Sequence, residues 1–149
     1  MINSILTDSV KKQCRDCQII SVKIKGENMK NVEYKYDYDY DILVIKKLEA
    51  FVYDKTVEID ELLLDFDENN SPISLEILDA SQRLNISKDS LRNIINFKIS
   101  ISVNEKFISL YCMFNVKVHN EKFSSSFKSS AGNYSNIPMM ESEFAYEYA

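Results

Sequence analysis

The regular alternation of apolar and polar residues in the second half of the chain is the feature that most limits its fold. Apolar side chains occupy every second position from Phe97 to Val103 and again from Ile108 to Val118. Successive residues of a strand point to opposite faces, so a period of two predicts two half-buried strands. Phe123 and Phe127 indicate a third strand after a turn at 119–122. We therefore predict a three-stranded antiparallel meander.

The C-terminal segment carries a second alternating pattern. Residues 128–136 are polar and predict a loop, after which apolar side chains become dense, at Ile137, Met139, Met140, Phe144, Tyr146 and Tyr148. A period-two segment of this kind suits a strand that adds to a sheet edge. We expect the tail to be ordered against the sheet. It either docks within its own chain or contributes to a symmetric homodimer, the commonest oligomer.

The first half of the chain predicts shorter strands. Alternation marks 20–25 and 32–36, a continuous apolar run marks Ile42–Ile45, and Val57 and Ile59 begin a pattern that resumes after a phase slip at Glu61. The turn-forming cluster 67–70 then predicts a hairpin. Six side chains should be buried in it: Leu62, Leu64, Phe66, Ile73, Leu75 and Ile77.

Helices are expected to be few and short. A weak apolar stripe at spacings of three and four runs through residues 2–17. A second helix is predicted across about 87–96, with Ser87 as its N-cap and Asp89 in the first turn. The fold class is therefore α+β, mainly antiparallel sheet in hairpins and a meander, with two or three short helices. The length of 149 residues favours a single domain, 1–149.

Three segments of the middle region carry a family resemblance. They are YDYDYDILVI at 36–45, LLLDFDENNSPISLEILDAS at 62–81, and the continuation from Gln82 into a helix. Together they resemble a small prokaryotic family known as domain of unknown function 2283, over about residues 32–95. The resemblance implies a small α+β fold on an antiparallel sheet, with a turn at Asp37–Asp41. It brings no established activity and no catalytic residues. Segments 1–31 and 97–149 lie outside it.

Charge and composition narrow the classes of partner. The net charge is −5, and Arg15, Arg83 and Arg92 are the three arginines. Nucleic-acid binding needs a basic stripe that neutralises phosphates, so we expect no nucleic-acid partner. Acidity also disfavours an anionic membrane surface, and no apolar run approaches the roughly 20 residues of a membrane helix. We see no export signal and expect a cytoplasmic protein.

The cysteines and the single histidine offer little chemistry. Cys14 and Cys17 have redox or half-zinc spacing, and Cys112 and His119 are the other candidate ligands. The last two differ in parity on the predicted long strand, so their side chains face opposite sides. We predict reduced cysteines that bind no metal and serve packing. His119 lies in a predicted turn, where a solvent-exposed role is favoured over that of a general base.

An acidic group occupies the predicted turns of the family-like segment. Its members are Asp37, Asp41, Asp65, Asp67, Glu68, Glu76 and Asp79. Brought together, these carboxylates could bind Mg²⁺ or Ca²⁺, or form an acid–base pair. The segment lacks the glycine and terminal Glu of an EF-hand loop. Aspartate also stabilises turns by accepting bonds from local backbone N–H groups, which is the reading we favour.

No residue is assigned a catalytic, cofactor-binding or metal-binding role, and no cofactor is expected. Two glycines cannot build a nucleotide-binding loop or a nucleophile elbow. The prediction is a non-catalytic interaction module that self-associates, as a homodimer or other homo-oligomer. One alternative, by family analogy, is an antitoxin-like regulatory partner of a small toxin-like protein. Another is a metal-binding protein or enzyme that uses the acidic turns.

Overall fold

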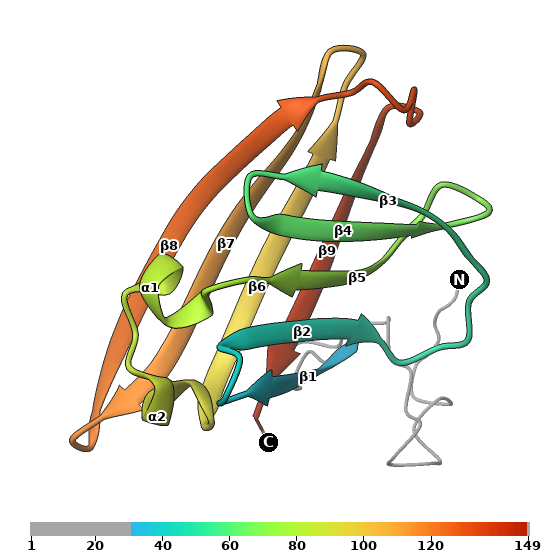
Figure 1. Cartoon of the computed structure of the whole chain (residues 1–149). Coiled ribbons are helices and arrows are strands. Elements are labelled where there is room, and N and C mark those ends of the chain that lie inside the picture. The colour runs from blue at the N-terminus through green and yellow to red at the C-terminus, as the bar shows by residue number, and fades with distance from the viewer. Residues whose placement is uncertain (1–30, 149) are drawn as a thin grey trace, which may run out of the picture.

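The computed structural model describes residues 31–148 of the chain, which form two antiparallel sheets and two short helices (Figure 1). The predicted helix at 2–17 and strand at 20–25 lie outside these residues. The strands are β1 (Val32–Asp37), β2 (Ile42–Lys47), β3 (Tyr53–Ile59), β4 (Leu62–Asp67), β5 (Pro72–Ile77), β6 (Ile94–Val103), β7 (Phe107–Val118), β8 (Glu121–Gly132) and β9 (Met140–Glu147). The helices are α1 (Ala80–Leu84) and α2 (Lys88–Leu91).

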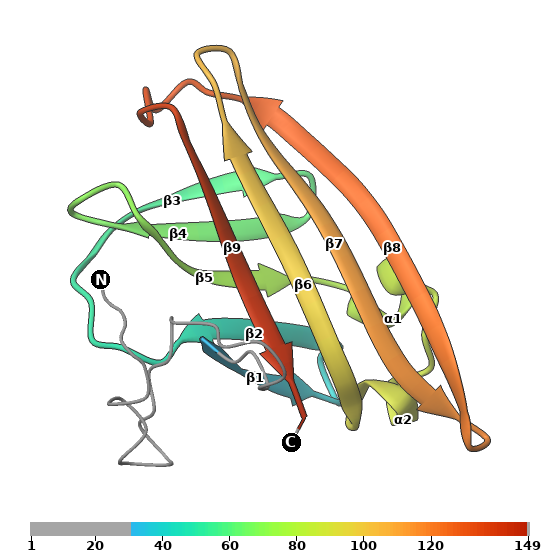
Figure 2. The same cartoon turned by 180° about the vertical axis from the view of Figure 1, so that it is seen from behind.

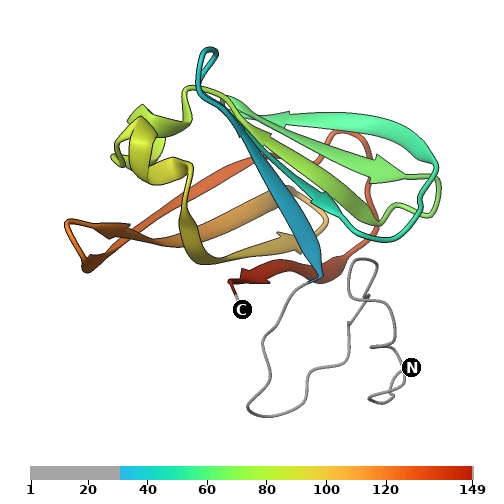
Figure 3. The same ribbon diagram turned by 90° about the horizontal axis from the view of Figure 1, so that it is seen from below.

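The two sheets pack face to face as a sandwich. One has five strands in the order β1-β2-β5-β4-β3, and the other has four in the order β8-β7-β6-β9. Strands of the first sheet run across those of the second (Figures 1 and 2). The helices lie at one side, between the two layers (Figure 3). The molecule is thus mainly antiparallel β-sheet with few short helices. No helix among residues 31–148 is long and apolar enough to cross a membrane.

The predicted β4–β5 hairpin is confirmed. Leu64 pairs with Leu75 and Leu62 with Ile77, and all six side chains expected to be buried are at most 2% exposed. Asn70 takes a positive φ of 62° in the turn. Asp67 fixes that turn, because its Oδ1 accepts bonds from the Asn69 and Ser71 backbone N–H groups, both at 2.9 Å. Alternation and turn chemistry therefore agree in this segment.

The phase slip at Glu61 is a chain reversal. The alternating pattern from Val57 to Phe66 is not one strand. Asp60 and Glu61 form the turn between the antiparallel strands β3 and β4. Asp60 has φ 57°, a left-handed conformation that Asp tolerates because its side chain is short and polar. Ile59 and Leu62 are paired across this turn, which places both on the buried face.

The helix predicted at 87–96 is shorter than expected. Ser87 is its N-cap, as predicted, and accepts a bond from the Ser90 backbone N–H at 3.2 Å, but α2 ends at Leu91. Ile94 and Ile95 belong to β6. Over so few residues, the apolar spacing of a helix cannot be told from that of a buried strand. Pairing of Ile94 with Val116 favours the strand. The helix that the resemblance implied at Gln82 is α1, which begins two residues earlier, at Ala80.

The predicted meander is confirmed as β6, β7 and β8, and Asp37–Asp41 is a turn, as the resemblance implied. The predicted loop at 128–136 is wrong in its first half. Strand β8 continues to Gly132, because its serines pair with β7 along the full ladder from Glu121 to Gly132. A Cβ at Gly132 would lie 2.5 Å from Cε2 of Tyr134, so a glycine fits where the chain leaves the strand.

The C-terminal tail is ordered against the sheet within its own chain. It forms β9, which pairs with β6 from Met140 to Glu147. Phe144 is fully buried opposite Ile99, whereas Met139 and Tyr148 are exposed. The expectation of a docked tail is therefore confirmed, and the docking partner is the tail's own subunit.

One apolar core joins the two sheets. Buried side chains from both sheets form a single cluster, and aromatic rings close one end of it. Tyr34 of β1 meets Tyr146 of β9 edge-on at 5.0 Å between ring centroids, and Phe97 stacks on Tyr146 at 5.4 Å. The Tyr34 hydroxyl also accepts a bond from the Ile94 backbone N–H at 3.1 Å. The period-two tyrosines of β1 thus point between the layers.

Candidate functional site

Asp41 is the centre of a polar junction between the β1–β2 turn and α1. Its Oδ1 accepts bonds from the Tyr36 hydroxyl at 2.6 Å and the Ser81 backbone N–H at 2.9 Å. Its Oδ2 accepts a bond from the Ser81 hydroxyl at 2.6 Å, and its carbonyl accepts one from the Ala80 N–H at 3.0 Å. Asp41 is 8% exposed. This junction brings together residues 36–41 and 79–81, which lie at opposite ends of the family-like motifs.

The electrostatics of the junction favour an ionised Asp41 beside a neutral Tyr36. Burial alone would raise the pKa of Asp41, but hydrogen bonds from Ser81 and Tyr36 more than offset it and hold the pKa below its usual value. Burial and the bond to the Asp41 carboxylate raise the pKa of Tyr36. A carboxylate that is ionised at neutral pH and accepts bonds from three donor groups is a structural anchor. Both carboxylate oxygens of Asp41 accept hydrogen bonds from groups of its own chain.

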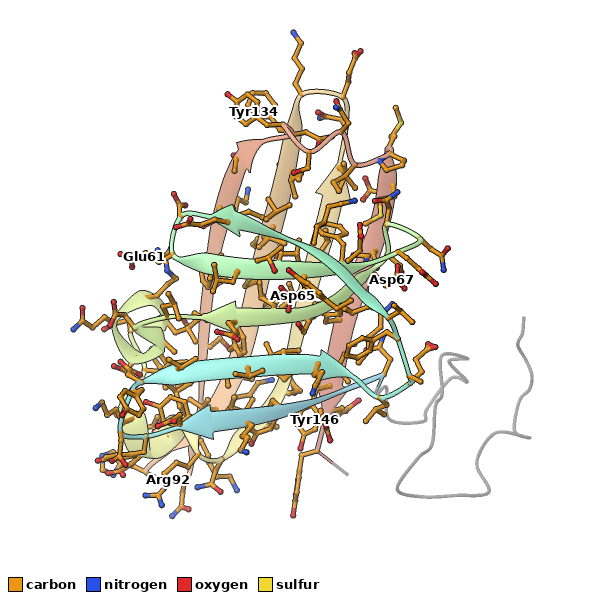
Figure 4. All side chains as sticks on the ribbon, turned by 45° about the vertical axis from the view of Figure 1, so that its right-hand side comes forward. Glu61, Asp65, Asp67, Arg92, Tyr134 and Tyr146 are labelled. Carbon is orange, nitrogen blue, oxygen red and sulfur yellow. The ribbon has the colours of Figure 1, made fainter. Side chains whose placement is uncertain are left out.

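Asp65 fills a similar role on the outer face of the five-stranded sheet (Figure 4). The Thr56 hydroxyl donates to its Oδ1 at 2.6 Å and the Ser74 hydroxyl donates to its Oδ2 at 2.8 Å. These three residues lie on the neighbouring strands β3, β4 and β5. The carboxylate therefore ties three strands together across the sheet.

The remaining acidic candidates are dispersed. Asp37 accepts a bond from the Tyr40 backbone N–H at 3.0 Å, and Asp79 adopts φ 52° ahead of α1 without a side-chain cap bond. Glu76 stands on the outer face of β5, and Glu68 is exposed beyond β4. Within residues 31–148, no three His, Cys, Asp or Glu side chains are grouped so that they could hold a metal ion. Local turn chemistry describes Asp37 and Asp67, whereas Asp41 binds the distant Ser81.

Cys112 lies on β7, whereas His119 follows the end of that strand. Cys112 is fully buried on β7, and burial raises the pKa of its thiol to about 12. His119 is exposed in the β7–β8 turn with φ 52°. Cys14 and Cys17 lie outside the described residues. A protonated, enclosed thiol is a packing group rather than a nucleophile.

Arg83 of α1 contacts side chains of β8 and of the β3–β4 turn. Its guanidinium lies 5.5 Å from the centroid of the Phe127 ring and 3.6 Å from the Glu61 carboxylate. Its Nε is buried without a hydrogen-bond partner. Arg83 therefore connects α1 to β8 on one side and to the β3–β4 turn on the other.

The outer face of the four-stranded sheet is rich in hydroxyl groups. We call it the serine face, comprising Ser100, Ser102, Ser109, Ser124, Ser126 and Ser130. A shallow depression of about 340 Å³ lies over four residues of this face, Ser100, Ser102, Ser109 and Ser130, beside Tyr111 and Lys128. The Lys128 ammonium sits 5.7 Å from the centroid of the Tyr111 ring. Glu141 and Glu143 border the face along β9, and Lys122 and Lys128 border it along β8.

Strand β8 is an outermost strand with an unpaired edge. It is 12 residues long, pairs with β7, and has no strand on its other side among residues 31–148 (Figures 1 and 2). Phe123 is 40% exposed on it. The opposite edge, β9, is partly covered, because Asn31 donates to the Ala145 carbonyl at 3.1 Å and its Oδ1 accepts from the Ala145 N–H at 2.9 Å. The full length of β8 could not be predicted from the sequence, because its serines and lysines weaken the apolar alternation.

Aromatic and basic side chains also gather where the β1–β2 turn meets α2. The Tyr38 ring faces the Lys88 ammonium at 5.2 Å and the Arg92 guanidinium at 5.1 Å. Lys88 also donates to the Tyr38 carbonyl at 3.2 Å. Tyr40, next to it in the turn, is 76% exposed. Sequence reasoning missed this contact because the partners are fifty residues apart.

The fold and these contacts define a small two-sheet β-protein in which Asp41, Asp65 and Asp67 bind turns, strands and α1 of their own chain. The chain belongs to the family described as protein of unknown function (DUF2283), whose model matches residues 33–81. A Methanosarcina mazei protein named "Putative hypoxanthine phosphoribosyltransferase" is 33% identical over 87 residues, which cover 58% of this chain and 71% of that protein.

A second relative is an uncharacterised protein of Methanocaldococcus jannaschii. It is 38% identical over 66 residues, which cover 44% of this chain and 53% of that protein. No solved structure matches the chain significantly. The family's matched segment begins in β1 and ends at Ser81, so it includes every residue of the Asp41 junction.

Proposed function

We propose that this protein is a non-catalytic interaction module that associates with itself. The observation that carries the proposal is the edge of β8, a 12-residue strand that pairs with no strand on one side among residues 31–148 and exposes the side chain of Phe123. Unpaired N–H and C=O groups of an edge strand are a template for another chain. Main-chain bonds supply affinity in this mode of binding, and alternate side chains supply specificity.

The acidic residues support a non-catalytic role. A general acid or base needs a carboxyl group that can reach a substrate proton. Asp41 and Asp65 each accept two side-chain hydroxyl bonds from their own chain, and Asp67 holds two backbone N–H groups of its turn. These carboxylates are used to connect strands, turns and α1.

The transferase name of the Methanosarcina mazei relative does not determine our proposal. Binding a phosphorylated sugar calls for a glycine-rich loop or a helix N-terminus that presents several N–H groups. Residues 31–148 contain a single glycine, Gly132, and helices of five and four residues. We therefore do not propose phosphoribosyl transfer, and the experiment below measures it as an alternative outcome.

A small basic protein is the second candidate partner. The net charge of −5 suits a positively charged surface, because opposite charges steer association. An antitoxin-like regulator of a small toxin-like protein would have this property. The cytoplasm is the compartment we propose for either role, since the thiol of Cys112 is buried and unpaired.

The experiment is a mass measurement of the purified full chain across a range of concentrations. We expect a dimer that dissociates on dilution. A monomer at every concentration, together with transfer of the phosphoribosyl group to hypoxanthine by the pure chain, would overturn the proposal. A monomer that forms a defined complex with a co-purified basic protein would support the interaction role and replace the self-association.

A further inference from the structure

The sequence of β8 reads the same in both directions about Ser125. The segment Lys122–Lys128 is Lys-Phe-Ser-Ser-Ser-Phe-Lys. Odd-numbered residues of β8 share the face of Leu110 and Cys112, toward the core, and even-numbered ones share the serine face. Phe123 and Phe127 are therefore on one face, and the two lysines are on the other.

We propose that two copies of this chain associate by antiparallel pairing of their β8 edges about a two-fold axis at Ser125. This inference rests on the proposed self-association and specifies its surface and register. The result is one continuous eight-stranded sheet made from the two four-stranded sheets. The occupant of the free edge is a second copy because the palindromic sequence brings the two phenylalanines of one edge opposite those of the other.

The register follows from the faces of the strand. An axis perpendicular to the sheet keeps the inner face of both copies on the same side, so residues can oppose one another only when their numbers share parity. Centring on Ser125 places Phe123 opposite Phe127 of the second copy, twice. Aromatic cross-strand pairs stabilise antiparallel sheets. Phe127 is already half-buried and in contact with Arg83, so its ring is held in place.

The outer face contributes an opposing effect. In the same register Lys122 lies opposite Lys128 of the second copy, and like charges directly opposite destabilise a sheet. The association should therefore strengthen as added salt screens this repulsion. Extension of this sheet should stop at two subunits, because pairing consumes the β8 edge of both copies and Asn31 partly covers β9.

A charge reversal tests the register. Lys122→Glu turns both lysine pairs into Glu–Lys pairs and should strengthen the dimer about tenfold. Lys106→Glu, an exposed change of equal charge in the β6–β7 turn, is the matched control and should leave the dissociation constant within about twofold. Phe123→Ser should weaken the dimer while circular dichroism stays native. Weakening by Lys122→Glu, or an equal effect of both charge changes, would overturn the inference.

Disulfide trapping provides an independent measurement. In a Cys14→Ser, Cys17→Ser background, Ser125→Cys places two thiols directly opposite across the axis, within disulfide range. Ser130→Cys on the same strand is the control, because its copies lie far apart in this register. Oxidation should cross-link the Ser125→Cys chain alone. A dimer by mass that fails to cross-link leaves the proposed self-association standing and overturns the β8 interface.

Discussion

Single side chains in this protein are distinguished by the sheet face they occupy. Leu64 and Leu63 are neighbours on β4, yet Leu64 is fully buried between the layers and Leu63 is half-buried on the outer face. Burial removes apolar surface from water and fills the core to high density. The same residue type therefore has different energetic weight at adjacent positions.

Replacing Leu64 by Ala should lower the free energy of unfolding by about 2–5 kcal/mol, since it leaves a cavity among close-packed neighbours. Leu63→Ala is the matched control and should cost clearly less. Chemical denaturation of both variants measures the difference. Equal losses would mean that the inner face of β4 is not the packed one.

The Asp41 carboxylate makes a pH-dependent contribution. Asp41→Asn removes the charge that receives three hydrogen bonds and should cost about 1–3 kcal/mol near neutral pH. Because the pKa of Asp41 is lowered on folding from an ordinary value of 3.8, this advantage is present above that value and is lost as the pH falls below it. The stabilities of the two proteins from denaturation curves should approach one another as the pH falls below 3.8. A constant difference would contradict the anchor role.

The thiol of Cys112 should be unreactive in the native state. Its burial and its pKa of about 12 keep it protonated and enclosed at neutral pH. In the Cys14→Ser, Cys17→Ser background, a thiol reagent should find no reactive group before unfolding and one group after it. Rapid labelling of the native chain would show that β7 is accessible at this position.

At the scale of elements, β9 illustrates a strand that depends on its partner. It pairs with β6 along its whole length and buries Phe144, while its own sequence mixes three glutamates with aromatic residues. Without β6, the apolar side chains of β9 would have no sheet to pack against and β9 would have no strand to pair with. The strand thus completes the four-stranded sheet and contributes Tyr146 to the aromatic end of the core.

A chain that ends at Asn136 should melt at a clearly lower temperature than the full chain or fail to fold. Truncation exposes the edge of β6 and uncovers the core around Ile99 and Phe97. A chain that ends at Glu147 retains β9 and is the control, with a melting temperature close to that of the full chain. An unchanged melting temperature for the shorter chain would contradict the docking of β9.

At the scale of the whole molecule, the shared core suggests one cooperative unit. The family-like segment supplies the five-stranded sheet, and the remainder supplies the four-stranded sheet that covers it. Neither sheet has its own second layer. Each one therefore buries its apolar face against the other.

We predict a single unfolding transition for the described residues. Hydrogen exchange in β5 and β7 should report the same free energy of opening, because both strands line one core. A fragment of residues 31–95 should remain unfolded, since its inner face would be exposed to water. An independently folded fragment would show two domains.

The sequence by itself determined the strands whose two faces differ in polarity. Alternation and turn residues located β4, β5, β6 and β7, and the family resemblance located the turn before Ile42, because these signals are local. The turn cluster 67–70 similarly marked the position of Asn70, where the chain adopts positive φ. Strand alternation and turn residues can be recognised from a short segment alone, because they depend on local backbone geometry and on contact with water.

Only the tertiary structure decided which strands become neighbours and which polar groups meet. Asp41 reaches Ser81 forty residues away, and Tyr34 reaches Tyr146 across the two sheets. Strand β8 has so little apolar character that its pairing with β7 was needed to extend it to Gly132. Long-range pairing is governed by packing and by backbone hydrogen bonds between distant segments, for which a single segment carries no local signal.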